Sequence, residues 1–238
     1  MATDPAGNFA VSYTRNTNNN NPDIFAKQYS SNGTLLNVVN VATSSKAETH
    51  SSIAMAPDGR FDVAFQRQFS SSDDDILVNR YGPTGVLFGT NAVATSGDRE
   101  QAPSISMDNF GNAVVAYQKF DPGFLGFGGD WDIKARRISG TTGQLVGGEI
   151  NIRNTGDDEV LPSVALRRGG GGFVVAYNRS GAVEVAEVSS SSTVAAIRNA
   201  GSSRVSPAVS INGADFYLLT YTSTDSGDRN IRRRVGLL

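Results

Sequence analysis

Small and apolar residues recur along the chain in short segments that each end in an aromatic residue. The five segments read FAVSY, FDVAF, AVVAY, FVVAY and YLLTY, and they end at Tyr13, Phe65, Tyr117, Tyr177 and Tyr221. Successive aromatics are 52, 52, 60 and 44 residues apart. Alternation with a period of two predicts β-strands, and recurrence near every fifty residues predicts a radial β-repeat.

Each unit contains four predicted strands. In the second unit an alternating segment over residues 52–56 leads through Asp58-Gly59, which suits a tight hairpin turn, into the strand that ends at Phe65. Third and fourth strands follow as DILVNRY and VLFGTNAVAT. Four antiparallel strands make one blade, so the sequence predicts an all-β, five-bladed β-propeller with essentially no helix.

One domain accounts for the whole length, because 238 residues with 39% hydrophobic content can bury a sizeable core. The predicted blades cover residues 1–50, 51–102, 103–161, 162–206 and 207–238. The first blade lacks the start of its inner strand, and the last blade is incomplete because it ends after a third strand. Either the first and last blades close the ring by packing face to face, or the repeats belong to a longer array.

Charge and composition narrow the choice of partners. Lys and Arg total 21 against 23 for Asp and Glu, so the chain has no basic footprint for nucleic acid. The basic run Arg232–Arg234 is expected to lie on a solvent-exposed edge strand, where its charges oppose pairing with another strand. The sequence shows no apolar run long enough to predict membrane insertion. Runs of Asn and Ser, such as residues 18–21 and 189–192, are typical of surface-exposed β-repeats.

The units GNFAVSYTR, GNAVVAYQ and GGFVVAYN, each of the first two followed by a segment beginning D-I-x-A, resemble tandem repeats of large bacterial secreted and cell-surface proteins. Those proteins are known as haemolysin-type or cadherin-like calcium-binding proteins. The resemblance covers all five units and is weakest in the third strand of the fourth. It implies an extracellular, propeller-like module that is secreted or held at the cell surface, and it implies no reaction.

Three glutamates recur in register, five residues before the first apolar position of an inner strand: Glu48, Glu100 and Glu159. In a propeller they would line one rim of the central channel. Such a ring could hold a cation, or it could place two acids for sugar hydrolysis. Each Glu could instead cap a connecting loop by bonding its backbone amides. We favour the cap, and because small residues occupy the inner strands, no carboxylates are expected within them.

Three aspartates, Asp23, Asp75 and Asp132, precede the third strands in equivalent positions. Carboxylates clustered on a loop suit calcium, but Asp before a strand is also a common turn residue, and no DxDxDG loop is present. No cofactor is predicted, and any calcium should bind weakly. The lone histidine, His50, lacks an accompanying G-x-S-x-G motif and is expected to be a polar loop residue.

The loop KFDPGFLGFGGDW of the third unit departs most from the repeat. Asp132 lies fifteen positions after Tyr117, whereas the equivalent distance in the first two units is ten positions. The candidate ligand-binding residues in this glycine-rich loop are aromatic: Phe120, Phe124, Phe127 and Trp131. They could stack on sugar rings or insert into a partner, or they could fold back as a lid over the blade.

Two functions fit these observations. The first is a non-catalytic extracellular binding or adhesion module that takes a glycan or protein ligand, with the loop aromatics and the glutamates as candidate contacts. The alternative is a glycan-processing hydrolase that uses the carboxylates at the channel rim. Because the inner strands carry small residues, we favour the binding module.

Overall fold

The computed structural model describes residues 1–16, 21–123, 128–202, 204–224 and 229–237. These residues form nineteen β-strands in five antiparallel sheets, as the alternating sequence pattern predicts. Within the described residues, no helix has the length and apolar character needed to cross a membrane.

Chain order and sheet order agree in every sheet. The first two sheets contain β1 (Ala2–Thr3), β2 (Phe9–Asn16), β3 (Pro22–Tyr29), β4 (Leu35–Ala42), β5 (Glu48–Met55), β6 (Phe61–Ser70), β7 (Asp73–Tyr81) and β8 (Leu87–Ala94). The third and fourth contain β9 (Glu100–Met107), β10 (Ala113–Asp121), β11 (Asp130–Ile138), β12 (Leu145–Arg153), β13 (Glu159–Leu166), β14 (Phe173–Arg179), β15 (Ala182–Val188) and β16 (Val194–Gly201). The fifth contains β17 (Arg204–Ile211), β18 (Phe216–Ser223) and β19 (Asn230–Leu237).

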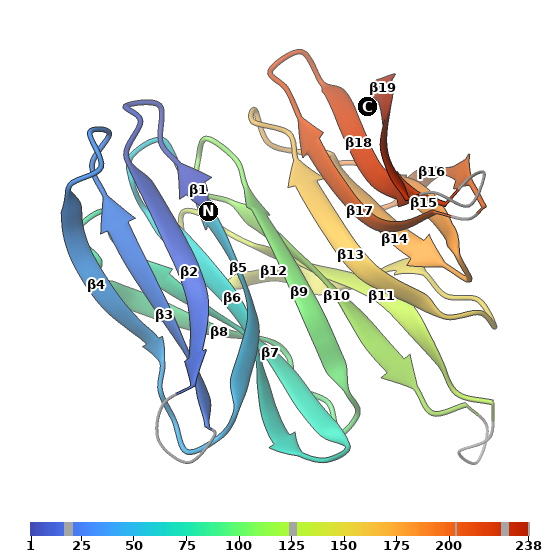
Figure 1. Ribbon diagram of the computed structural model, residues 1–238, viewed down its shortest axis with the longest axis horizontal. Coiled ribbons are helices and arrows are strands. Elements are labelled where there is room, and N and C mark those ends of the chain that lie inside the picture. Colours follow the sequence, from blue (N-terminus) through green and yellow to red (C-terminus); the bar gives the residue numbers. More distant parts are fainter. Residues whose placement is uncertain (17–20, 124–127, 203, 225–228, 238) are drawn as a thin grey trace.

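The sheets are the blades of a five-bladed β-propeller whose last blade has three strands (Figure 1). The first strands of neighbouring blades, β5, β9, β13 and β17, pack against one another in that order. Serine side chains on these strands connect the blades. The Oγ atoms of Ser52, Ser104 and Ser163 each accept the backbone N–H of the next blade's inner strand, at 3.0 to 3.2 Å.

Each inner strand from the second blade on contains the same irregularity. The register with the second strand shifts near its start, and one non-glycine residue there adopts a positive φ: His50 (52°), Ala102 (52°), Leu161 (58°) or Ser206 (53°). A β-bulge of this kind lets a strand continue past a kink. The strands therefore begin at residues 48, 100, 159 and 204, three residues before the predicted blade starts at 51, 103, 162 and 207. His50 lies within β5 rather than in a loop.

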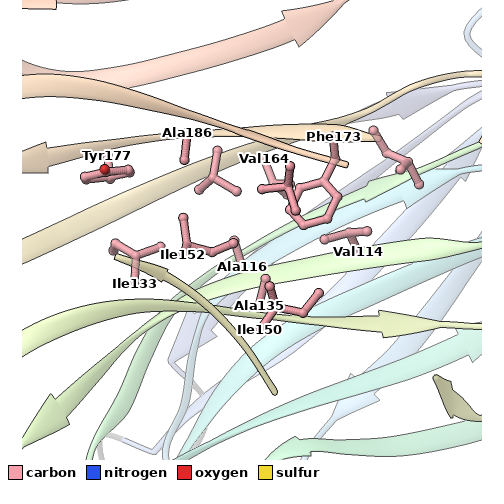
Figure 2. Packing of buried hydrophobic residues seen from close by; sticks show 13 residues of the cluster. Val114, Ala116, Ile133, Ala135, Ile150, Ile152, Val164, Phe173, Tyr177 and Ala186 are labelled. Carbon is pink, nitrogen blue, oxygen red and sulfur yellow. The ribbon is translucent and has the colours of Figure 1, made fainter. Parts of the chain in front are cut away.

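Apolar side chains fill the spaces between blades. Figure 2 shows the core between the third and fourth blades, where Ile133 and Ile152 of the third blade face Val164, Phe173 and Tyr177 of the fourth. Four of the recurring aromatics are buried in such cores: Phe65, Tyr117, Tyr177 and Tyr221. The fifth, Tyr13, is only half-buried, so the first blade departs from the pattern of the other four.

Extensive packing in the described part of the chain joins only strands of the same blade or of consecutive blades. In Figure 1 the blades follow one another from the blue first blade on the left to the red fifth blade at the upper right. Of the two arrangements that the sequence left open, a ring closed by face-to-face packing of these two blades is not supported, because no extensive contact among the described residues joins them. Each therefore keeps one uncovered face.

Candidate functional site

The three recurring glutamates lie within the inner strands. Glu48, Glu100 and Glu159 are the first residues of β5, β9 and β13, and all three are fully buried. The expectation that these strands carry no carboxylates is therefore wrong. The bulge that follows each glutamate extends the strand to include it, and a bulge cannot be deduced from period-two alternation.

The three glutamates have similar partners, although the Oε2 atom of Glu159 is buried without a hydrogen bond. A hydroxyl four residues earlier donates to one carboxylate oxygen, from Ser44, Ser96 or Thr155. The backbone N–H groups of the two serines donate to the other oxygen, at 3.3 Å. A cation on the neighbouring second strand completes the set: Arg67 at 2.9 Å, Lys119 at 3.4 Å and Arg179 at 3.3 Å. The carboxylates thus bond the connecting loops, the geometry of a cap.

This environment leaves little for a metal or a substrate to bind. Burial raises the pKa of Glu100 and of Glu159, while the hydroxyls of Ser96 and Thr155 act in the opposite direction. Nowhere among the described residues do three or more His, Cys, Asp or Glu side chains gather in a way that could hold a metal ion.

The aspartates of the third strands differ from one another. Asp132 lies 2.9 Å from Lys134 Nζ and accepts a hydrogen bond from Asn154 Nδ2 at 2.8 Å. Burial raises the pKa of Asp75 to about 6, and the nearby carboxylates of Asp73 and Glu100 add to this shift. Asp75 is thus a carboxyl group with a raised pKa at the same end of the blades as the glutamates.

The long loop of the third blade lies at that end. Its described aromatics, Phe120 and Trp131, form a cross-strand pair on β10 and β11 with their ring centroids 5.4 Å apart in an edge-to-face arrangement. Both side chains are half-buried. Phe124 and Phe127, the other two candidates in this loop, lie outside the described residues.

Arg99 completes the aromatic cluster. Its guanidinium carbon lies 4.9 Å from the ring centroid of Phe120 and 5.2 Å from that of Trp131. The backbone N–H of Phe120 also donates to the carbonyl oxygen of Arg99 at 2.9 Å. The sequence did not single out Arg99. A usable signal was its departure from the repeat, because Ala47 and Asp158 occupy the same place before the other two glutamates.

Carboxylates surround this Phe120–Trp131–Arg99 cluster. Asp158 accepts the backbone N–H of Trp131 at 3.2 Å. Burial and the neighbouring carboxylates of Asp132, Asp121 and Asp158 raise the pKa of Asp130. Half-buried rings beside several hydrogen-bond acceptors can bind a molecule that has both apolar faces and hydroxyl groups.

No protein-family model matches the chain, and no curated protein matches it. Solved structures with the same fold do match. A protein of unknown function from Dyadobacter fermentans has a TM-score of 0.68 at 10% identity, over 98% of this chain and 76% of that one. An endo-arabinase from Bacteroides thetaiotaomicron has a TM-score of 0.55 at 14% identity, over 99% and 97%. A Hadza microbial sialidase has a TM-score of 0.63 at 12% identity, over 99% and 55%.

At these identities the likeness shows the fold alone. None of these matches supports the resemblance to haemolysin-type or cadherin-like proteins. The fold does not decide between binding and hydrolysis, so the choice between these functions depends on this chain's own residues.

Proposed function

We propose that this chain is a non-catalytic, extracellular glycan-binding module that contacts its ligand with the Phe120–Trp131–Arg99 cluster. The observation that carries the proposal is this half-buried aromatic and cationic cluster, whose two aromatic residues flank the loop that departs most from the repeat. Aromatic rings stack on the apolar faces of sugars, and the surrounding aspartates can accept hydrogen bonds from hydroxyl groups. The polar, asparagine- and serine-rich surface and the resemblance to secreted repeats support the extracellular setting.

The glutamates support binding over catalysis. A catalytic carboxyl must reach its substrate, whereas Glu48, Glu100 and Glu159 are fully buried and paired with cations. Their environment also repeats in three blades. A repeated set of contacts is expected of a structural element, while an active site is specialised in one place.

One observation favours a hydrolase as the second candidate. Asp75 has its pKa raised to about 6 and lies near Asp73 and Glu100. A glycosidase needs one carboxyl that remains protonated near neutral pH and a second that is ionised. In this alternative, Asp75 would be the acid.

A glycan array run beside a panel of aryl glycosides separates the two candidates. The array should include arabinan fragments and sialylated glycans, because structures of the same fold include an arabinase and a sialidase. Trp131→Ala should abolish binding, and Phe110→Ala is the matched control. Phe110 is 64% exposed and lies in the turn between β9 and β10, at the far end of β10 from Phe120. Turnover that Asp75→Asn removes would establish the hydrolase, and unchanged binding by Trp131→Ala would place the site elsewhere.

A further inference from the structure

The uncovered face of the fifth blade repeats a surface that is interior in the other blades. One aliphatic residue near the start of each third strand faces the next blade. In the first four blades these residues, Ile24, Ile76, Ile133 and Val183, are all 0% exposed. Their equivalent in the fifth blade, Ile231, is 83% exposed. This position belongs to a blade-to-blade interface whose second side is missing among the described residues.

Other apolar residues of the fifth blade share this face with Ile231. The pairing of β18 with β19 places Leu218 beside Val235 and Thr222 beside Ile231, all on one side of the sheet. The opposite side, with Leu219 and Tyr221, packs against the fourth blade. Leu218 and Val235 are 38% and 62% exposed, so the face is apolar and uncovered.

The first blade presents the complementary face. In the second blade, Phe61, Val63 and Phe65 pack against the blade before it. Their equivalents in the first blade are Phe9, Val11 and Tyr13, which are only half-buried. Two of them stack on neighbouring rings of the same blade: Phe9 on Tyr29 at 4.9 Å and Tyr13 on Phe25 at 5.9 Å.

We propose that the fifth blade of one copy of the chain packs against the first blade of a second copy, in a head-to-tail contact that continues the row of blades. Thr220 and Val11 then take the places that Ala64 and Val115 hold in the core between the second and third blades. A second copy is the occupant because the two faces have the two sides of the established interface, and extensive packing within one chain does not join them. Such a contact is heterologous, so it forms either a closed ring of copies or an open chain.

Charge and polar contacts set the strength of this contact. Ala208 replaces the serine that accepts the next blade's backbone N–H, so that hydrogen bond is lost. Arg233 lies on the fifth-blade face, while Arg15 and Lys27 lie over the rings of the first-blade face. Apolar burial therefore drives association against the repulsion of like charges, and added salt should strengthen it.

Sedimentation velocity over a series of concentrations tests the proposal. The parent should self-associate in a concentration-dependent way, and Ile231→Lys should raise the dissociation constant at least tenfold, since it places a charge at the centre of the contact. Val86→Lys is the matched control, because Val86 is exposed but lies on the second blade, whose two faces are covered. A parent that remains monomeric, or equal behaviour of the two lysine variants, would overturn the proposal.

Cysteine cross-linking tests the geometry, because the chain has no cysteine of its own. A mixture of Val11→Cys and Thr220→Cys under mild oxidation should give a disulfide-linked heterodimer. Ser71→Cys, on an exposed turn, should not cross-link when it replaces Thr220→Cys in the mixture. If the double variant instead forms an internal disulfide at dilutions where the mixture gives none, the ring closes within one chain and the proposal is wrong.

Discussion

The third and fifth blades have similar sequences and different surroundings. In the third blade, every residue of the strand segment AVVAY, from Ala113 to Tyr117, is buried, because blades cover both faces. In the fifth blade, the segment YLLTY buries Tyr217, Leu219 and Tyr221, while Leu218 remains exposed. The comparison shows that a local pattern specifies the strand, whereas the neighbouring blade decides whether an apolar residue becomes core or surface.

The largest expected effect concerns the recurring aromatics. Tyr117→Ala should lower the free energy of unfolding by about 3 to 5 kcal/mol, because Tyr117 is fully buried and its hydroxyl donates to Glu149 at 2.6 Å. Tyr13→Ala, at the same position in the first blade, should cost less than about 2 kcal/mol since Tyr13 is half-buried. Urea unfolding of both variants measures the difference. Equal losses would mean that the first blade is covered like the third.

The next effect concerns the buried glutamates of the interior blades. Glu100→Gln should lower the free energy of unfolding by about 1 to 3 kcal/mol, because it removes the buried anion that pairs with the half-buried Lys119. Calcium should not raise the melting temperature of the parent or of the variant. Thermal unfolding with and without calcium checks both points. Stabilisation of the parent alone at sub-millimolar calcium would show that the glutamates bind the ion.

The smallest effect concerns Asp75 between the second and third blades. Its pKa is raised from 3.8 to about 6 in the folded chain, so the folded state binds a proton more tightly than the unfolded state between these values. Its contribution to stability is therefore present at low pH and is lost as the pH rises through about 6. Asp75→Asn should flatten this part of the pH profile and gain less than about 1 kcal/mol at neutral pH. If the stability of Asp75→Asn depends on pH as the parent's does, Asp75 is not the source of this pH dependence.

Period and alternation were sufficient to predict the blades. The recurring aromatics located the second strands, and the turns at Gly33 and Gly59 have the positive φ values that tight hairpins require. The strand extension past His50 and its equivalents was not predictable, because non-glycine residues rarely adopt a positive φ.

The candidate site was predictable only in part. The unusual length of the third-blade loop singles out Phe120 and Trp131 in the sequence. Arg99 was missed because it lies on the connection from the second blade to the third, about twenty residues earlier in the chain. The partners of the three glutamates could not be predicted from the sequence either. The pairing of first and second strands, including its register shift, brings Arg67, Lys119 and Arg179 to them.

The most direct test of the difference between interior and terminal blades is a matched pair of substitutions at equivalent positions. In dilute solution, Ile133→Ala should lower the free energy of unfolding by about 2 to 5 kcal/mol. Ile231→Ala should change it by less than about 0.5 kcal/mol, because this side chain is already exposed to solvent. Urea unfolding of the two variants beside the parent gives the answer. Equal losses would contradict the account, because they would show that the fifth blade's outward face is covered within the same chain.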